Sequence, residues 1–223
     1  MAEEVPKKII MVVDDEQEIR ESLQKTLSRE GFEVVLAESG PDCTNKLETI
    51  RPDLILLDIF MYPWDGWRTL DEIKKNPETQ DIPISMLTVV PLTIEDFEDK
   101  PIERSKFVYI ENYLVKPINR DDLLRAVRDI IGLEEYLKKV VNLLIQNKEE
   151  KGAKDFEKAA RNLYRNRKLK QSLVKCLVEE AKNIERVRKV IELQERNIEL
   201  SMLQIRALEG RYRKYGIRLV GGK

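Results

Sequence analysis

In residues 9–15, IIMVVDD, five apolar residues precede two aspartates. In residues 54–58, LILLD, and 113–117, YLVKP, a charged residue likewise follows an apolar run. Short runs rich in Val, Ile and Leu are typical of strands buried on both faces, as in a parallel sheet covered by helices. The carboxyl ends of parallel strands lie along one edge of the sheet, where ligands bind. Three carboxylates and one ammonium are therefore expected to converge on one pocket. These side chains belong to Asp14, Asp15, Asp58 and Lys116.

The N-terminal half of the chain alternates predicted strands with predicted helices. Strands are expected at residues 8–13, 32–37, 53–59, 83–89 and 112–115. Helices are expected over residues 16–30, from Ser39 or Pro41 to Ile50, over residues 67–75, and from Asn119 to Ile131. This alternation predicts an α/β fold, a doubly wound domain around a five-stranded parallel sheet.

The distribution of charge divides the chain near residue 132. Residues 1–132 contain 17 Lys and Arg against 28 Asp and Glu, whereas residues 133–223 contain 23 against 13. The formal net charge of −1 is therefore a cancellation between an acidic half and a basic half. No proline follows residue 132, which favours long helices. We predict two domains, residues 1–132 and an all-helical module of residues 133–223.

Three helices are predicted in or near the basic half. The helix that begins at Asn119 is expected to continue through or just past Gly132 to residue 147. A second is expected over residues 153–166, and a third, long helix from Leu177.

A seven-residue repeat marks the third of these helices. Its apolar members are Ile184, Ile191, Ile198 and Ile205. The neighbouring seam mixes apolar with polar residues, namely Leu173, Val187 and Leu208 with Glu180, Gln194 and Ser201. The repeat predicts coiled-coil-like packing, and the polar interruptions favour an antiparallel bundle or helix hairpin, within one chain or shared by two, over a regular zipper.

Five basic residues at a 4-3-4-3 spacing share one face of the predicted second helix. They are Lys154, Lys158, Arg161, Arg165 and Lys168. Such a face could contact nucleic-acid phosphates, an anionic membrane surface or an acidic protein. We favour a solvated face, or one that docks on the acidic half, because no helix-turn-helix, winged-helix or zinc-ligand pattern accompanies it.

Rare and absent residue types exclude several functions. The chain has no histidine, which excludes Ser/His and Cys/His catalysis, histidine-bound zinc and a phosphohistidine on the chain itself. Cys43 and Cys176 lack metal-ligand spacing and are typical of a protein from a reducing compartment. Neither a signal peptide nor a run of about 20 apolar residues is present, so we expect a cytoplasmic protein without a membrane span.

Residues 8–131 resemble the receiver domain of two-component response regulators. The resemblance rests on five motifs in order, which are VVDD at 12–15, LLD at 56–58, DG at 65–66, LT at 87–88 and YLVKP at 113–117. It implies a receiver, flavodoxin-like fold and a sensor histidine kinase as the partner that donates a phosphoryl group. Residues 133–223 match no familiar output domain.

The clustered acids imply a metal ion. Three carboxylates held together repel one another unless a cation joins them, and oxygen ligands with retained waters suit Mg²⁺. By resemblance, Asp15, Asp58 and the backbone carbonyl of Phe60 would ligate Mg²⁺ directly, whereas Asp14 would act mainly through a metal-bound water.

The resemblance also assigns the phosphoryl chemistry. Asp58 would be the phosphoacceptor, a carboxylate that attacks the phosphoryl group of a partner's phosphohistidine and forms an acyl phosphate. Lys116 and the Thr88 hydroxyl would each bind a phosphoryl oxygen, and Tyr113 would turn inward as an aromatic switch. Chemistry on an external substrate is not expected.

Several positions depart from the pattern of the family. Tyr62 occupies a position where the family usually has proline. The bulky Phe60 and Val89 border the pocket, and they predict slow autodephosphorylation by shielding the acyl phosphate from water. The stretch between Thr88 and Lys116 is longer than usual, and its prolines and acidic run interrupt the predicted fourth helix, which predicts an unusual output face.

Three functions follow in order of preference. The first is a response regulator phosphorylated on Asp58, whose helical module acts as a homodimer interface or binds a helical partner protein through residues 133–223. The second is a transcriptional regulator whose basic helices bind DNA, a nucleic-acid partner that we do not favour. The third is a scaffold that works without phosphorylation.

Overall fold

The structure is a computed structural model that describes residues 6–89, 110–179 and 184–218. The described residues form two compact units. The first unit contains residues 6–89 and 112–131, and the second contains residues 110–111, 132–179 and 184–218.

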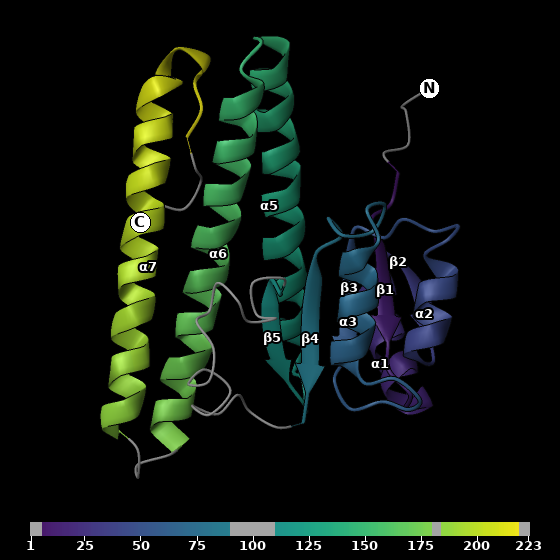
Figure 1. The fold of residues 1–223 in the computed structure, drawn as a ribbon. Helices are drawn as coiled ribbons and strands as arrows, with labels where there is room; N and C mark the ends of the chain where they lie inside the picture. Colours follow the sequence, from purple (N-terminus) through teal and green to yellow (C-terminus); the bar gives the residue numbers. More distant parts are fainter. Residues whose placement is uncertain (1–5, 90–109, 180–183, 219–223) are drawn as a thin grey trace. The chain divides into compact units, whose positions relative to one another are not determined.

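Five parallel strands form one sheet in the first unit, as predicted (Figure 1). The strands are β1 (Ile9–Val13), β2 (Glu33–Ala37), β3 (Leu54–Asp58), β4 (Ile84–Thr88) and β5 (Asn112–Val115). Their order is β2-β1-β3-β4-β5, so β3 is central and β1 adjoins it. Val13 pairs with Leu57 and Asp58 pairs with Leu87, which brings the carboxyl ends of these strands to one edge.

The apolar runs occupy the inner strands of this sheet. Every residue of β3 and β4 is buried, and so are four of the five residues of β1. The edge strands β2 and β5 are only partly buried. A strand covered on both faces has no solvent side, which explains why these runs do not alternate with polar residues.

Three helices of the first unit follow its strands. They are α1 (Gln17–Arg29), α2 (Gly40–Lys46) and α3 (Gly66–Lys75). The side chains of Ser39, Asp65 and Asn119 each accept a hydrogen bond from the backbone N–H three residues later and so begin α2, α3 and α5. The predicted end of the second helix at Ile50 is wrong, because the chain after Lys46 tightens into turns with hydrogen bonds from residue i to residue i−3.

α5 (Arg120–Gln146) continues from the first unit into the second without a break at Gly132. A Cβ at Gly132 would meet no atom within 4 Å, so nothing requires glycine there and nothing ends the helix. No helix in the described part of the chain combines the length and the hydropathy required for a membrane span.

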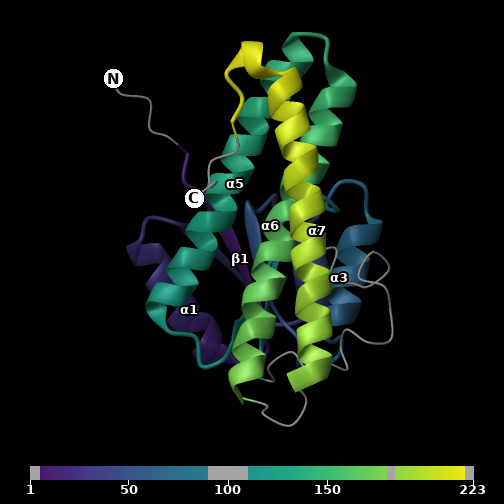
Figure 2. The ribbon, with the colours of Figure 1, turned by 90° about the vertical axis from the view of Figure 1, so that its left-hand side faces the viewer.

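The second unit is an antiparallel arrangement of three helices (Figures 1 and 2). α6 (Glu150–Glu179) and α7 (Ile184–Arg211) pack along each other as a hairpin, and the second half of α5 joins their core. The helix predicted over residues 153–166 does not end at residue 166, because α6 continues to Glu179. α6 includes Leu173 and Leu177, because no Gly or Pro interrupts the chain between residues 153 and 179.

The core of this second unit contains apolar residues from all three helices. Its most buried members are Leu137, Leu144, Ala153, Phe156, Ala159, Ala160, Leu163, Ile205 and Tyr212. Gly152 lets α6 approach Tyr212, since a Cβ there would lie 1.9 Å from the tyrosine hydroxyl. A short 3-10 helix, η3 (Arg213–Tyr215), follows α7.

Two members of the seven-residue repeat of α7 face this core. Ile198 and Ile205 pack into it, and so does Leu208 of the neighbouring seam. The polar residues of that seam, Gln194 and Ser201, are also buried. Neither polar atom of the Gln194 amide has a hydrogen-bond partner among the described residues. The predicted Glu180 interruption lies outside the described residues.

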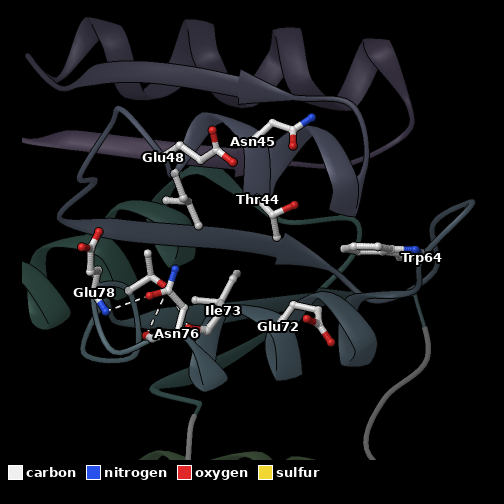
Figure 3. Close-up of a pocket in the computed structure, with 10 residues that line it drawn as sticks. Thr44, Asn45, Glu48, Trp64, Glu72, Ile73, Asn76 and Glu78 are labelled. Atoms are coloured by element: carbon white, nitrogen blue, oxygen red, sulfur yellow. Dashed lines mark hydrogen bonds between the residues drawn. The ribbon is translucent and has the colours of Figure 1, made fainter.

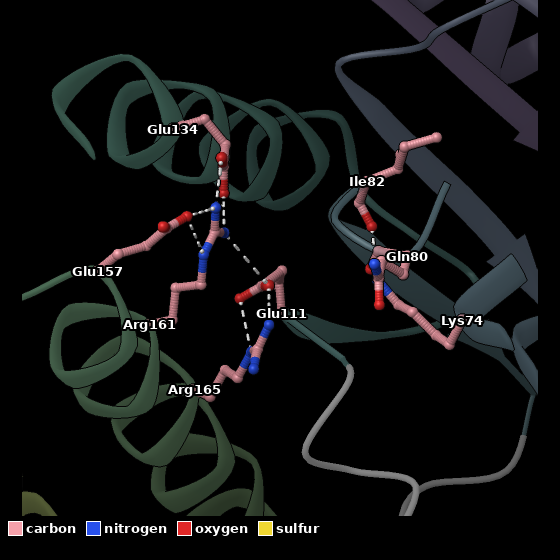
Figure 4. Close-up of polar contacts among 8 residues, drawn as sticks. All are labelled: Lys74, Gln80, Ile82, Glu111, Glu134, Glu157, Arg161 and Arg165. Atoms are coloured by element: carbon pink, nitrogen blue, oxygen red, sulfur yellow. Dashed lines mark hydrogen bonds and ion pairs between the residues drawn. The ribbon is translucent and has the colours of Figure 1, made fainter. Parts of the chain in front are cut away.

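A network of ion pairs lies inside the second unit (Figure 4). The Arg161 guanidinium on α6 bonds Glu134 of α5 and lies 2.9 Å from Glu157, while Arg165 makes a two-bond contact with Glu111 at 2.6 and 3.1 Å. Although burial disfavours the charged guanidinium, these carboxylates raise the pKa of Arg161 above its ordinary value. Two of the five cations of the predicted basic face are therefore neutralised within the chain.

Candidate functional site

Three aspartates meet at the carboxyl edge of the sheet, as predicted. Asp14 and Asp15 follow β1, and Asp58 is the last residue of the neighbouring β3. Each offers a carboxylate oxygen, and these oxygens all lie within 4.8 Å of one another. Because β1 and β3 are adjacent and in register, the sheet itself holds the three acids together.

Lys116 brings a cation to the same acids. It follows β5, and its backbone N–H donates to the carbonyl oxygen of Thr88 at 2.7 Å, which ties the end of β5 to the end of β4. Its ammonium lies 2.7 Å from Asp14 Oδ2 and 3.1 Å from Asp58 Oδ1. The predicted convergence of the four side chains is therefore confirmed, although β5 is two strands away from β3 in the sheet.

Asp14 and Asp15 have different surroundings. Asp14 is buried, and its two carboxylate oxygens accept hydrogen bonds from the Glu16 N–H at 3.0 Å and from Lys116. Asp15 is exposed, and one of its oxygens accepts a hydrogen bond from the Tyr62 N–H at 3.2 Å. The carboxylate of Asp14 is thus occupied by the protein, whereas that of Asp15 faces solvent.

Two supporting residues of the site were not identified from the sequence. Arg20 of α1 donates to the carbonyl oxygen of Asp14 at 2.6 Å and fixes the turn that follows β1. Gly66 packs against the backbone of Asp58, where a Cβ would lie 2.2 Å from the Asp58 carbonyl oxygen. The Asp65-Gly66 motif indicated a turn, but nothing in the sequence revealed that this turn touches Asp58.

Burial and charge set the titration of the site. Burial raises the pKa of Asp58 to about 6, because the effect of desolvation and of the Asp14 charge exceeds the opposing effect of Lys116. Burial also disfavours the Lys116 ammonium, yet its contacts with Asp14 and Asp58 outweigh that effect and raise the pKa of Lys116. Near neutral pH the Asp58 carboxylate is therefore mostly ionised beside the Lys116 ammonium.

The remaining predicted site residues lie at the ends of the adjoining strands. Thr88 is buried as the last residue of β4. Tyr113 of β5 is partly buried, and its ring centroid lies 6.4 Å from that of Trp67 on α3. Phe60 and Val89 are exposed, so their shielding of an acyl phosphate stays a prediction. The predicted interruption of a fourth helix lies between residues 90 and 109, outside the described residues.

The acid cluster fits a small, hard divalent cation. All three candidate side chains offer carboxylate oxygens, which Mg²⁺ prefers, and no nitrogen or sulfur ligand stands among them. The exposed Asp15 leaves a side open to the water molecules that Mg²⁺ retains. Asp58 and Asp15 would be direct ligands, since the Asp14 oxygens are engaged by Lys116 and Glu16.

Mg²⁺ affinity is expected to depend on pH through Asp58. A carboxyl with a pKa of about 6 is mostly protonated at lower pH and must lose its proton to bind the ion. We expect affinity to fall about tenfold for each pH unit below 6, with a smaller change above it. Titration calorimetry at about pH 5 and about pH 7.5, with Asp58→Asn as a control that flattens the difference, measures this. Equal affinities at both pH values in the wild-type protein would contradict it.

The same pKa fixes the sign of a stability effect in the metal-free protein. Because the pKa of Asp58 is raised on folding, its contribution to the free energy of unfolding is most favourable below about pH 4 and is lost as the pH rises to about 6. Mg²⁺ bound at Asp58 would counteract this loss only where Asp58 is ionised. The increase in melting temperature on adding Mg²⁺ should accordingly be larger at neutral than at acidic pH.

A hollow lies between α2 and α3 (Figure 3). Its lining residues are Thr44, Asn45, Leu47, Glu48, Trp64, Glu72, Ile73, Asn76, Glu78 and Thr79. None of them belongs to the acid cluster. The Asn76 side chain accepts from the Glu78 N–H at 2.9 Å and the Thr79 hydroxyl donates to the Ile73 carbonyl at 2.7 Å, so these polar groups serve to end α3.

Known proteins resemble the first unit. The family model for the response regulator receiver domain matches residues 10–128. A probable transcriptional regulator, ycf27, of Cyanophora paradoxa is 34% identical over 132 residues, which are 59% of this chain and 52% of that protein. Protein PilG of Pseudomonas aeruginosa is 31% identical over 119 residues, 53% of this chain and 84% of PilG. Response regulator TrrA of Thermotoga maritima, solved in complex with Mg(2+)-BeF, is 33% identical, covers 55% of this chain and 98% of its own, and gives a TM-score of 0.47.

The chain belongs to the response regulator receiver family, since the family model matches more than half of its length. It is thus related to two-component signalling proteins. The match ends at residue 128 and does not include α6 or α7. The chain spans about half the length of ycf27, the first of the relatives above.

Proposed function

We propose that the protein is a response regulator that accepts a phosphoryl group on Asp58 from a sensor histidine kinase and signals through its helical unit. The observation that supports this most directly is the position of the Lys116 ammonium, 2.7 Å from Asp14 and 3.1 Å from Asp58, beside a third carboxylate. A buried cation next to a nucleophilic carboxylate is the arrangement that phosphoryl transfer requires.

In the proposed reaction, an ionised oxygen of Asp58 attacks the phosphorus of a phosphohistidine on the kinase. A new O–P bond forms on Asp58, the P–N bond of the donor breaks, and the imidazole leaves with a proton from solvent. Lys116 stabilises the charge that spreads over the phosphoryl oxygens. When bound by Asp15, Asp58 and the Phe60 carbonyl, Mg²⁺ would neutralise the carboxylates and attract the same oxygens.

The phosphorylated state would differ at the ends of β4 and β5. The Thr88 hydroxyl would donate to a phosphoryl oxygen and draw the end of β4 inward. Tyr113 would then change its contact with Trp67. These movements would present a changed surface to a partner, as added charge does in other phosphorylation switches.

The proposal is tested with the full chain, Mg²⁺ and a small acyl phosphate as donor. We expect the intact mass to increase by one phosphoryl group, and peptide mapping after borohydride reduction to place it on Asp58. Asp58→Asn and omission of Mg²⁺ should each abolish the modification. An unmodified wild-type protein, or label that persists in Asp58→Asn at the same level, would refute the proposed function.

We propose protein association as the output of the helical unit. The DNA-binding alternative requires a basic surface, yet Arg161 and Arg165 are engaged by Glu111, Glu134 and Glu157. Among the five predicted cations of this face, Lys154 and Lys158 are the exposed ones. DNA binding by the chain with a steep dependence on salt would favour the alternative.

A further inference from the structure

One face of α7 exposes leucines that its own helical unit does not cover. Leu193, Leu200 and Leu203 are 46%, 53% and 60% exposed, although the opposite face of the same helix packs into the core of the second unit. A single exposed leucine needs no explanation, but leucines at matching positions of successive turns indicate a surface that contacts another helix.

These leucines belong to a regular seam. Counting three and four residues alternately along α7 gives Leu193, Arg196, Leu200, Leu203, Ala207 and Gly210, all of them exposed. We call this set the outer seam. Its spacing is that of coiled-coil core positions, and it spans about 27 Å of helix. The inner seam, with Ile198, Ile205 and Leu208, is already occupied by α5 and α6.

Gly210 is the least expected member of the outer seam. Glycine in a helix costs stability, and a Cβ at Gly210 would meet no atom within 4 Å among the described residues. The fold of the chain therefore gives no reason for glycine at this position. A small residue there leaves room for a side chain from outside.

We propose that the outer seam binds the outer seam of a second copy of this chain, with the two α7 helices antiparallel. A two-fold axis between residues 201 and 202 places Leu200 opposite the partner's Leu203 and Leu193 opposite the partner's Gly210. It also places Arg196 opposite the partner's Ala207, where the long arginine stem can cover a small residue. Large residues meet small ones at both ends of the contact, and leucines meet at its centre.

The charges beside the outer seam favour the same arrangement. Glu192 and Glu199 flank its N-terminal half, whereas Arg206 and Arg211 flank its C-terminal half. In the antiparallel pair, Glu199 lies beside the partner's Arg206, and the symmetry repeats this contact. No ion pair within the described chain engages Glu199 or Arg206, so both charges are available to a partner.

A parallel pair is disfavoured by the same residues. In register, Arg196 would face the partner's Arg196, and Arg206 would lie beside the partner's Arg211, which places like charges in contact. Gly210 would face glycine and leave a gap. The combination of size and charge therefore selects the antiparallel second copy as the occupant of this face, independently of any chemistry at Asp58.

Sedimentation equilibrium of the full chain tests the proposal. We expect a reversible dimer, and we expect Leu200→Glu to weaken it about tenfold or more, because it places a charge against the partner's Leu203 at the centre of the contact. Ile145→Glu on α5 is the matched control, since Ile145 is 48% exposed and lies outside the outer seam. A wild-type protein that stays monomeric, or Leu200→Glu with wild-type affinity, would overturn the proposal.

A charge exchange tests the antiparallel direction. Glu199→Arg should weaken the dimer about tenfold, and Glu199→Arg with Arg206→Glu in the same chain should restore it. Both positions are exposed, so these variants are expected to fold. Because a parallel pair would not bring residues 199 and 206 together, failure of the second exchange to restore the affinity would overturn the antiparallel arrangement.

Discussion

Lys116→Met is expected to slow phosphorylation of Asp58 about 100- to 1000-fold at saturating Mg²⁺, because the ammonium that stabilises the transferring group is removed. Methionine keeps the length of the buried side chain without its charge. Time courses of intact mass with a small acyl phosphate measure the rate directly. Because Lys116 contacts both Asp14 and Asp58, the variant should also raise the pKa of Asp58 further above 6 and weaken Mg²⁺ binding below neutral pH.

Lys74→Met is the matched control for this variant. The Lys74 ammonium on α3 donates to the carbonyl oxygens of Gln80 and Ile82, each at 2.7 Å, and it lies outside the acid cluster (Figure 4). Its loss should lower the stability of the first unit but leave the phosphorylation rate within about twofold of wild type. If Lys116→Met and Lys74→Met were phosphorylated at the same rate, the role proposed for Lys116 would be wrong.

The acid cluster could be predicted because its position depends on topology. Asp14 and Asp15 follow β1 directly and Asp58 ends β3, and parallel strands end at one edge whatever the details of packing. The apolar runs before them identify buried strands without any knowledge of their neighbours. The convergence of Lys116 on the same acids was also predicted, since it too follows a strand.

The supporting residues of the site could not be predicted from the sequence. Arg20 reaches a backbone carbonyl, and Gly66 is needed because α3 begins against the backbone of Asp58. Both contacts depend on the distance between a helix and the sheet, and hydrophobic periodicity does not predict that distance. A glycine after a helix cap has the same sequence pattern whether it borders solvent or the backbone of a site residue.

In the helical unit, hydrophobic periodicity likewise predicted some features and missed others. The repeat that contains Ile198 and Ile205 correctly identified the inner face of α7. The length of α6 was missed because no cap or breaker marks its true end, and the pairing of Arg165 with Glu111 joins residues 54 apart in the chain. Basic residues on a helix face look alike in sequence whether solvent or buried carboxylates surround them.

Arg161 lies within 4.0 Å of three carboxylates in the helical unit. Its guanidinium is 15% exposed and contacts Glu134 and Glu157, with Glu111 at 4.0 Å. Removing one partner of a buried ion pair leaves the other charged and poorly solvated, and that is costlier than never having formed the pair. Replacing one partner of the network therefore lowers the free energy of unfolding more than replacing both partners does.

Arg161→Met is expected to lower the free energy of unfolding of the helical unit by about 3 kcal/mol, because Glu134 remains buried without its cation. Urea unfolding followed by far-ultraviolet circular dichroism measures the change, and the fluorescence of Trp64 and Trp67 reports the first unit separately. Lys158→Met, an exposed position one turn earlier on α6, should change stability by no more than about 0.5 kcal/mol. Adding Glu134→Leu to Arg161→Met should recover most of the loss, since the unpaired charge is then gone as well. A single variant that matches Lys158→Met would mean that water, and not Arg161, solvates the Glu134 carboxylate.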